Sequence, residues 1–270
     1  MADHQCQENV QRSTDPMATM VHKVPTTSDY QVKMIRRLMP ADCLVVPFST
    51  PVIAFGNPRT SRVATLAINP SNIEFEKKRQ PLPDSERRLA TLQSLGATDT
   101  SALSEAQVEV VVRECDEYFQ RNPYMTWFGP LDKILKEGLG ASYMDGSAYH
   151  LDVVQWATSA KWSALPPVVR ESLINESRSH LINQLREETF DAVVVNGASV
   201  WRVLVESGLA KYEVERIIRF GKNQTKCELR VGDGHGTRFI GWSSNIQSQN
   251  GANEKGFTQQ LSAWLKEMVQ

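Results

Sequence analysis

The chain has 270 residues, of which 41% are hydrophobic and 23% are charged, the usual balance for a globular protein of one large or two small domains. It contains no run of about 18 apolar residues and no charged-then-apolar start typical of a secretory signal, so we expect a cytoplasmic protein with no membrane partner. The formal net charge of −1 excludes nucleic-acid binding through the overall field and leaves only local basic patches, at 36–37, 77–79 and 87–88.

The sequence contains four cysteines, Cys6, Cys43, Cys115 and Cys227, which lie far apart and form no CxxC pair. This spacing does not fit a zinc knuckle or an iron–sulfur centre. We therefore expect free thiols, and a protein that works without a metal or any other cofactor.

Residues 1–28 are polar, show no periodicity and contain Pro16 and Pro25, which predicts a flexible N-terminal tail. Residues 29–270 are predicted to form a single domain. Short β-rich apolar runs recur along it, and several are continuous, as in strands buried on both faces of a parallel or mixed sheet. The predicted strands are 44–46, 52–55, 63–68, 149–154, 192–195, 217–220 and 239–242.

Helices are predicted between and after these strands. Ser104 and Gln107 form a capping box ahead of an apolar stripe at helical spacing, and Asp84 is placed to cap a shorter helix that ends at Gly96. Apolar residues between 257 and 268 mark a C-terminal helix. The alternation predicts an α/β fold, a three-layer α/β/α sandwich with a central, mostly parallel sheet, in which about 76–122 is a helical insertion.

In an open α/β sheet the ligand binds at the carboxyl ends of the strands, so polar residues directly after a strand are candidate site residues. Three groups meet this description: 69–72, where Pro70 holds Asn69 extended; His150 with Asp152; and 243–248. Each has an ordinary structural alternative, because Asn-Pro is a common turn dipeptide and a loop rich in Ser, Asn and Gln is hydrophilic in any protein.

Five segments resemble, in order, motifs of the uracil-DNA glycosylase superfamily, in its mismatch-specific uracil/thymine glycosylase branch. They are LAINPS at 66–71, NPYMTWFGPLDKIL at 122–135, AYHLDVVQWAT at 148–158, VVVNGASVW at 193–201 and IGWSSNIQSQNG at 240–251. Ala67 stands where that family usually has Gly, and the last segment lacks the family's Pro. The resemblance implies a uracil-DNA glycosylase-like fold and an enzyme that flips a nucleotide out of DNA and hydrolyses the bond between base and sugar.

The resemblance also implies roles for individual residues. Asn69 would hold the attacking water through its side-chain carbonyl, with His150 and Asp152 completing the catalytic set. The flipped base would contact Ile68, Pro70, Phe75, Trp127, Phe128 and Asp152, and Tyr124 is a further candidate for stacking. DNA phosphates would be bound by Ser71, Asn72, Ser243, Ser244, Asn245, Gln247 and Ser248.

Asp152 is the most informative departure from the family. Uracil-specific relatives resemble this segment but carry Asn at the matching position. An ionised carboxylate accepts hydrogen bonds and donates none, so it suits the exocyclic amine of cytosine and repels the carbonyl of uracil. The alternative is a structural Asp that caps or pairs near a strand end. His150, two residues earlier on the same face, either bonds the base or fills a core site.

The sequence thus predicts a monofunctional glycosylase, because no Lys stands in a matched motif to form a Schiff base. Its substrate would be a modified cytosine in DNA, since the chain is similar to bacterial phage-defence glycosylases that remove glucosylated hydroxymethylcytosine. The alternatives are a uracil/thymine mismatch repair glycosylase, a catalytically silent modified-base reader, and a small-molecule nucleoside hydrolase or transferase on another α/β fold. No obligate protein partner is expected.

Overall fold

The computed structural model describes residues 27–247 and 255–269. The predicted tail, except for its last two residues, and the predicted phosphate ligand Ser248 lie outside these ranges. The first helix begins at Asp29, next to the predicted start of the folded domain. No helix among the described residues combines the length and the apolar character needed to cross a membrane.

A six-stranded sheet forms the centre of the molecule, in the order β4-β1-β5-β8-β7-β6. The first four strands are mutually parallel, and β7 and β6 continue the sheet in antiparallel fashion. The strands are β1 (Val63–Ala67), β4 (Ala148–Asp152), β5 (Ala192–Asn196), β6 (Lys211–Phe220), β7 (Thr225–Gly234) and β8 (Thr237–Trp242). The strands β4 and β5 are buried along their whole length. The apolar run of β5 predicts this burial, whereas β4 buries the polar residues His150 and Asp152 as well.

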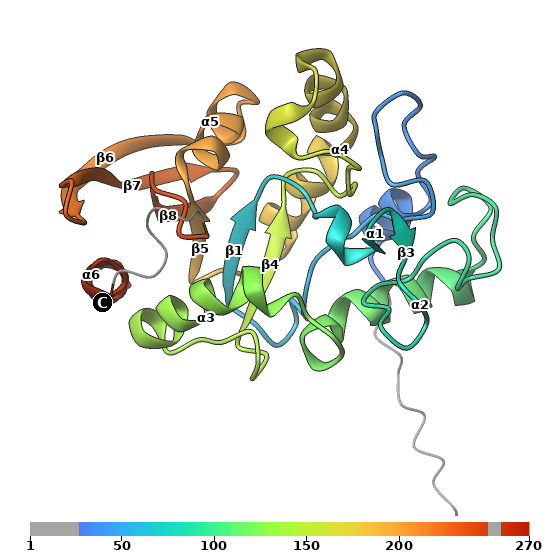
Figure 1. Ribbon diagram of the computed structural model, residues 1–270, viewed down its shortest axis with the longest axis horizontal. Coiled ribbons are helices and arrows are strands. Elements are labelled where there is room, and N and C mark those ends of the chain that lie inside the picture. The colour runs from blue at the N-terminus through green and yellow to red at the C-terminus, as the bar shows by residue number, and fades with distance from the viewer. Residues whose placement is uncertain (1–26, 248–254, 270) are drawn as a thin grey trace, which may run out of the picture.

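Helices lie on both sides of this sheet, so the predicted three-layer α/β/α sandwich is confirmed. In Figure 1, α4 and α5 lie toward the top of the view and α3 and α6 toward the bottom, with the sheet between them. The helices are α1 (Asp29–Ile35), α2 (Glu105–Asp116), α3 (Met125–Leu139), α4 (Pro167–Glu187), α5 (Ala198–Glu206) and α6 (Lys255–Met268). Three 3₁₀ turns, η1 (Asn72–Glu74), η2 (Tyr118–Gln120) and η3 (Trp162–Ala164), and a small hairpin of β2 (Glu76–Lys77) and β3 (Gln80–Pro81) complete the fold.

The capping box at the start of α2 is confirmed, with Ser104 and Gln107 bonding each other's backbone. The C-terminal helix is confirmed as well. It packs closely on α3, where a Cβ added to Gly138 would lie 2.8 Å from the Ser262 carbonyl oxygen. The close approach of these helices fixes α3, which carries aromatic residues of the candidate site.

Two predicted strands, 44–46 and 52–55, are wrong. They contain only isolated bridges, Val45 to Thr158 and Phe55 to His150. Their apolar side chains are buried except for Leu44, but their backbone mostly bonds the loop after β4, for example Val52 N to Gln155 O at 2.8 Å. These segments are mostly buried although they do not belong to the sheet, and this burial explains why their composition resembles that of strands.

The helix predicted from Asp84 to Gly96 is also wrong, since this stretch consists of turns. Thr91 and Ser94 bond each other's backbone through their side chains, the local bonding with which hydroxyl residues compete against a helix. The insertion at 76–122 therefore holds one α-helix, α2, with the β2–β3 hairpin and η2.

Candidate functional site

The strands β1 and β4 place the first two predicted groups side by side. Their parallel register pairs Thr65 with His150 and Ala67 with Asp152, so both strands end at the same edge. A cavity of about 540 Å³ opens at this edge. Its lining includes ten of the residues predicted from sequence: Asn69, Pro70, Ser71, Asn72, Tyr124, Trp127, Phe128, His150, Asp152 and Asn245.

The Asn69 side chain is held in one orientation. Its Nδ2 donates to Pro70 O at 3.0 Å and to Thr158 Oγ1 at 3.1 Å, and it lies 3.5 Å from Trp156 O. Two of these partners are carbonyl oxygens, which only accept, so the amide nitrogen must face them. The side-chain carbonyl of Asn69 is therefore the atom that remains to accept a hydrogen bond from a water molecule in the cavity.

Asp152 is a buried carboxyl with no hydrogen-bond partner on either oxygen, although its side chain lines the cavity and only 4% of the residue is exposed. Burial raises the pKa of Asp152 above its ordinary value, and His150 opposes that shift. His150 Nε2 lies 3.6 Å from Asp152 Oδ1, which is an ion-pair distance rather than a hydrogen bond. An unpaired buried carboxyl is costly to keep, so Asp152 is a candidate ligand-binding group rather than a cap.

His150 belongs to a chain of hydroxyl contacts behind the cavity. Its Nδ1 lies 2.6 Å from Thr65 Oγ1, which in turn lies 2.6 Å from the Tyr143 hydroxyl. If Tyr143 donates to Thr65, and Thr65 to Nδ1, then the imidazole proton lies on Nε2 and points toward Asp152. The sequence prediction named His150 but missed Thr65, which lies within an apolar strand.

Glu74 is a second buried carboxyl on the cavity, and sequence reasoning missed it. It lies in η1, only 3% exposed, and accepts a 2.7 Å hydrogen bond from the Tyr118 hydroxyl at Oε2. Burial raises the pKa of Glu74 to about 7, against the lowering effects of Tyr118 and Arg88, and Asp152 adds a small upward shift. A three-residue segment Asn-Ile-Glu gives no local signal that its carboxyl is buried.

Aromatic side chains form much of the wall. Phe55, Tyr124, Trp127, Phe128 and Trp162 line the cavity. The predicted base contact Phe75 does not: its side chain is buried and lies among the core residues. It follows η1 directly, where the chain turns away from the cavity, and Phe55 from the loop before β1 lines the wall instead.

A smaller cavity of about 150 Å³ adjoins the first and shares Asn69, Trp127 and His150 with it. Ile68 and Gln247, both predicted from sequence, line this smaller space. The predicted base contact Ile68 and the predicted phosphate ligand Gln247 therefore lie beside the main cavity rather than in it.

Asn196, at the end of β5, organises the last predicted loop. Its Oδ1 accepts from Trp242 Nε1 at 2.8 Å and from Ile246 N at 3.1 Å, and its Nδ2 bonds the Gln247 side chain. Gln247 Nε2 in turn donates to Trp127 O at 3.2 Å. The sequence offered a signal for Asn196, a polar residue directly after an apolar strand, but only the surrounding segment was singled out.

The remaining predicted phosphate ligands are placed unequally. Ser243 Oγ accepts from Glu228 N at 2.8 Å and so ties β7 to the end of β8, and Ser244 lines neither cavity. Ser71 caps η1 by accepting from Ile73 N at 3.3 Å, and Asn72 donates to Glu76 at 2.7 Å. Ser71 and Asn72 nevertheless line the cavity, whereas Ser243 does not.

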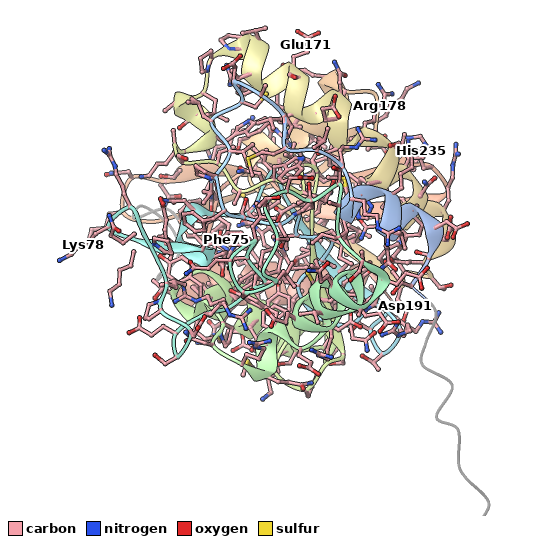
Figure 2. The ribbon with its side chains drawn as sticks, turned by 90° about the vertical axis from the view of Figure 1, so that its right-hand side faces the viewer. Phe75, Lys78, Glu171, Arg178, Asp191 and His235 are labelled. Carbon is pink, nitrogen blue, oxygen red and sulfur yellow. The ribbon has the colours of Figure 1, made fainter. Side chains whose placement is uncertain are left out.

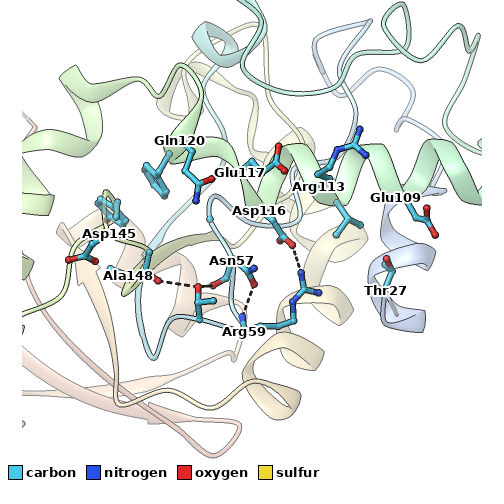
Figure 3. Close-up of a pocket in the computed structure, with 16 residues that line it drawn as sticks. Thr27, Asn57, Arg59, Glu109, Arg113, Asp116, Glu117, Gln120, Asp145 and Ala148 are labelled. Carbon is cyan, nitrogen blue, oxygen red and sulfur yellow. Dashed lines mark hydrogen bonds and ion pairs between the residues drawn. The ribbon is translucent and has the colours of Figure 1, made fainter. Parts of the chain in front are cut away.

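A separate cavity of about 520 Å³ lies at the other end of β4, where Ala148 begins the strand (Figure 3). Its lining mixes both signs of charge, with Arg59 paired to Asp116 at 2.5 Å. None of the residues predicted as site residues lines it. Within the described ranges, no group of three or more His, Cys, Asp or Glu side chains is placed to hold a metal ion.

The fold and the site define a three-layer α/β/α protein with a polar cavity of ligand size at the carboxyl ends of its parallel strands. Comparison with models of known protein families gives no match, and comparison with curated proteins gives none either. The functional argument therefore rests on the geometry of the site and on the motifs in the sequence.

Proposed function

We propose that this protein is a monofunctional DNA glycosylase that hydrolyses the N-glycosidic bond of a flipped, modified cytosine and leaves an abasic site. One observation carries the proposal: the oriented amide of Asn69 and the unpaired carboxyl of Asp152 line the same cavity from adjacent strands. The Asn69 amide is suited to hold a water molecule, and the Asp152 carboxyl is suited to bind a base.

The reaction needs only these two kinds of contact. Water adds its oxygen to the anomeric carbon of the sugar, the base leaves with the electrons of the glycosidic bond, and a water proton is given up to the medium or the base. Asn69 Oδ1 accepts a hydrogen bond from the water and places it. Because an amide takes no proton, the rate must come mainly from placement and from electrostatic support of the charges that develop on sugar and base.

Asp152 favours cytosine over uracil. The exocyclic amine of cytosine donates to a carboxylate, whereas the matching position of uracil carries a carbonyl acceptor. A donor brought to Asp152 stabilises its ionised form and so lowers the pKa that burial raises. Binding of a cytosine edge thus supplies the partner that the buried carboxyl lacks.

The size of the cavity supports a modified base. Its volume of about 540 Å³ lies within the range of roughly 300–1,000 Å³ typical of sites for drug-sized ligands, which exceed a single pyrimidine ring. The insertion supports the wall from outside, since Arg88 donates to Ile73 O and Asn122 O and lies over the ring of Tyr124, and both Ile73 and Tyr124 line the cavity. We propose that the substrate is a cytosine with a bulky substituent, such as glucosylated hydroxymethylcytosine in phage DNA.

The exposed basic turn of the β2–β3 hairpin supports the proposal that DNA binds close to the cavity. Its two turn residues, Lys78 and Arg79, have φ of 54° and 64°, a conformation that costs a side chain roughly 1–2 kcal/mol and favours Asn-Gly. Both side chains are exposed, and Figure 2 shows Lys78 at the periphery of the molecule. Lys78 lies only four residues after Glu74, which lines the cavity. We infer that Lys78 and Arg79, basic residues in a strained turn, contact DNA phosphates.

Incubation with duplexes that carry uracil, cytosine or modified cytosines, followed by cleavage of abasic sites with alkali, tests the proposal. Release of a modified cytosine, lost in Asn69→Ala, is the expected result. DNA binding without base release would instead favour a silent reader, and release of uracil or mismatched thymine a repair enzyme. Cleavage of free nucleosides but not of DNA would favour a small-molecule hydrolase, and each of these three results contradicts the proposal.

A further inference from the structure

The cavity carries more hydrogen-bond acceptors than one cytosine edge can use. Asp152 comes from β4 and Glu74 from η1, and both are nine-tenths or more buried. A cytosine presents one amino group, which the proposed function assigns to Asp152. Glu74 therefore needs a second donor, either from the protein or from the ligand.

The protein supplies that donor to only one oxygen of Glu74. Tyr118 donates to Oε2, and Arg88 Nε lies 4.0 Å from the same oxygen while it bonds the Asn122 carbonyl. Within the part of the chain that the structure describes, Oε1 has no hydrogen-bond partner. Glu74 thus faces the cavity with one oxygen satisfied and the other available.

We propose that Glu74 is a specificity-determining residue that accepts a hydrogen bond from a hydroxyl or amino group on the substituent of the flipped base. This inference rests on the proposed function and narrows its substrate class to cytosines whose substituent carries a hydrogen-bond donor. The unpaired carboxyl of Asp152 in the same cavity is an independent sign that a ligand with several donors belongs there.

The network around Glu74 suits this role. Tyr118 also accepts a 2.9 Å hydrogen bond from Tyr124 N, so the carboxyl is tied to the aromatic wall at the start of α3. The tie fixes where Oε1 lies relative to a base stacked on that wall. A pKa of about 7 leaves the carboxyl ready to ionise when a donor binds.

Binding of free nucleosides tests the inference without requiring DNA cleavage. The probes are 5-methyl-, 5-hydroxymethyl- and 5-aminomethyldeoxycytidine, and their binding is followed through quenching of tryptophan fluorescence, since Trp127 and Trp162 line the cavity. We expect the wild type to bind the two donor-bearing nucleosides about tenfold more tightly than the methyl compound.

The variant Glu74→Gln turns the free acceptor into a donor while Tyr118 keeps its partner. The aminomethyl substituent only donates hydrogen bonds, so this compound should bind the variant no more tightly than the methyl compound does. The hydroxymethyl substituent can also accept a hydrogen bond, so this compound should keep part of its tighter binding. The matched control Asp152→Asn changes the contact with the ring amine, which all three nucleosides share, and should weaken binding of all three alike. Equal loss for all three nucleosides in Glu74→Gln, no loss, or no binding by the wild type would overturn the inference. Base release from DNA, measured separately, decides the proposed function.

Discussion

His150 Nε2 lies 3.6 Å from Asp152 Oδ1, on the same face of β4, while its Nδ1 is held at 2.6 Å from the Thr65 hydroxyl. The contact of Nδ1 with Thr65 fixes the orientation of the imidazole ring, so that Nε2 faces the Asp152 carboxyl, which has no other partner. Because the pair is too long for a hydrogen bond, a small movement of Asp152 toward a bound base costs no existing bond. The arrangement favours a carboxyl that is oriented but free to exchange partners.

We predict that Asp152→Asn shifts base preference from cytosine-type toward uracil-type bases. The substitution keeps the shape and turns one acceptor into a donor, so mismatched groups are left buried and unpaired at about 1–3 kcal/mol each, roughly ten- to a hundredfold in discrimination. Competition between modified-cytosine and uracil duplexes measures the shift. An unchanged preference, together with ready uracil release by the wild type, would make Asp152 structural.

Asn69→Ala should lower base release by about a hundredfold or more while it leaves folding and DNA retention nearly intact. Among the described residues the amide bonds Pro70 O, Trp156 O and Thr158 Oγ1, so its loss removes few contacts and little burial. Single-turnover rates and thermal unfolding separate the two effects. Thr158→Val is the matched control, because it removes the hydroxyl that orients the amide and should give an intermediate loss. Full activity in Asn69→Ala removes this residue from the mechanism.

Glu74→Gln should stabilise the protein increasingly as the pH rises. The folded-state pKa of Glu74, about 7, exceeds its ordinary value of 4.5, so the folded protein holds the proton more tightly and wild-type stability falls between these two pH values. From pH 5 to pH 8 the stability of the variant relative to wild type should rise by about 2–3 kcal/mol. Urea unfolding at both pH values measures this difference, and a pH-independent difference would contradict the burial argument.

Replacement of the hairpin turn by Asn-Gly, as Lys78→Asn with Arg79→Gly, should raise stability and weaken DNA binding together. Gly removes the cost of the left-handed conformation at one position and Asn lowers it at the other, which together favour folding by about 1–2 kcal/mol. Loss of two cations should reduce the slope of log Kd against log salt by about 2. Gln224→Gly is the control, since Gln224 has φ of 52° in the β6–β7 turn at the far edge of the sheet. It should stabilise without any effect on DNA, and an unchanged salt slope in the double variant would exclude the hairpin from the interface.

The central strands could be predicted from sequence because each is short and mostly apolar, with few polar residues such as Thr65 in β1 and His150 in β4. The strand β7 was missed because strands were assigned from apolar runs, whereas Thr225–Gly234 alternates polar and apolar residues, the pattern of a strand with one face exposed, and ends in a segment with two glycines. The segments 44–46 and 52–55 were assigned wrongly because burial alone resembles strand composition. The sequence pattern indicates whether a side chain is buried. It does not indicate which segment supplies the hydrogen-bond partners of the backbone.

The site was predicted as far as polar residues lie at the carboxyl ends of strands. Asn69 follows β1, and His150 and Asp152 lie within the last three residues of β4. Glu74 could not be predicted, because its burial depends on Tyr118, which lies far along the chain in η2. Phe75 was misplaced for a similar reason, since the turn of η1 decides which of two neighbours faces the cavity. Local sequence indicates where a site lies, and long-range contacts decide which side chains enter it.

The position of β1 between β4 and β5 has a consequence for how the protein gains activity. This strand is synthesised early, yet both of its neighbours come much later in the chain. Non-local pairing of this kind is slow and must precede any arrangement of Asn69 against Asp152. A refolding chain should therefore regain its helical signal before its function, and the return of base binding should mark the closing step of folding.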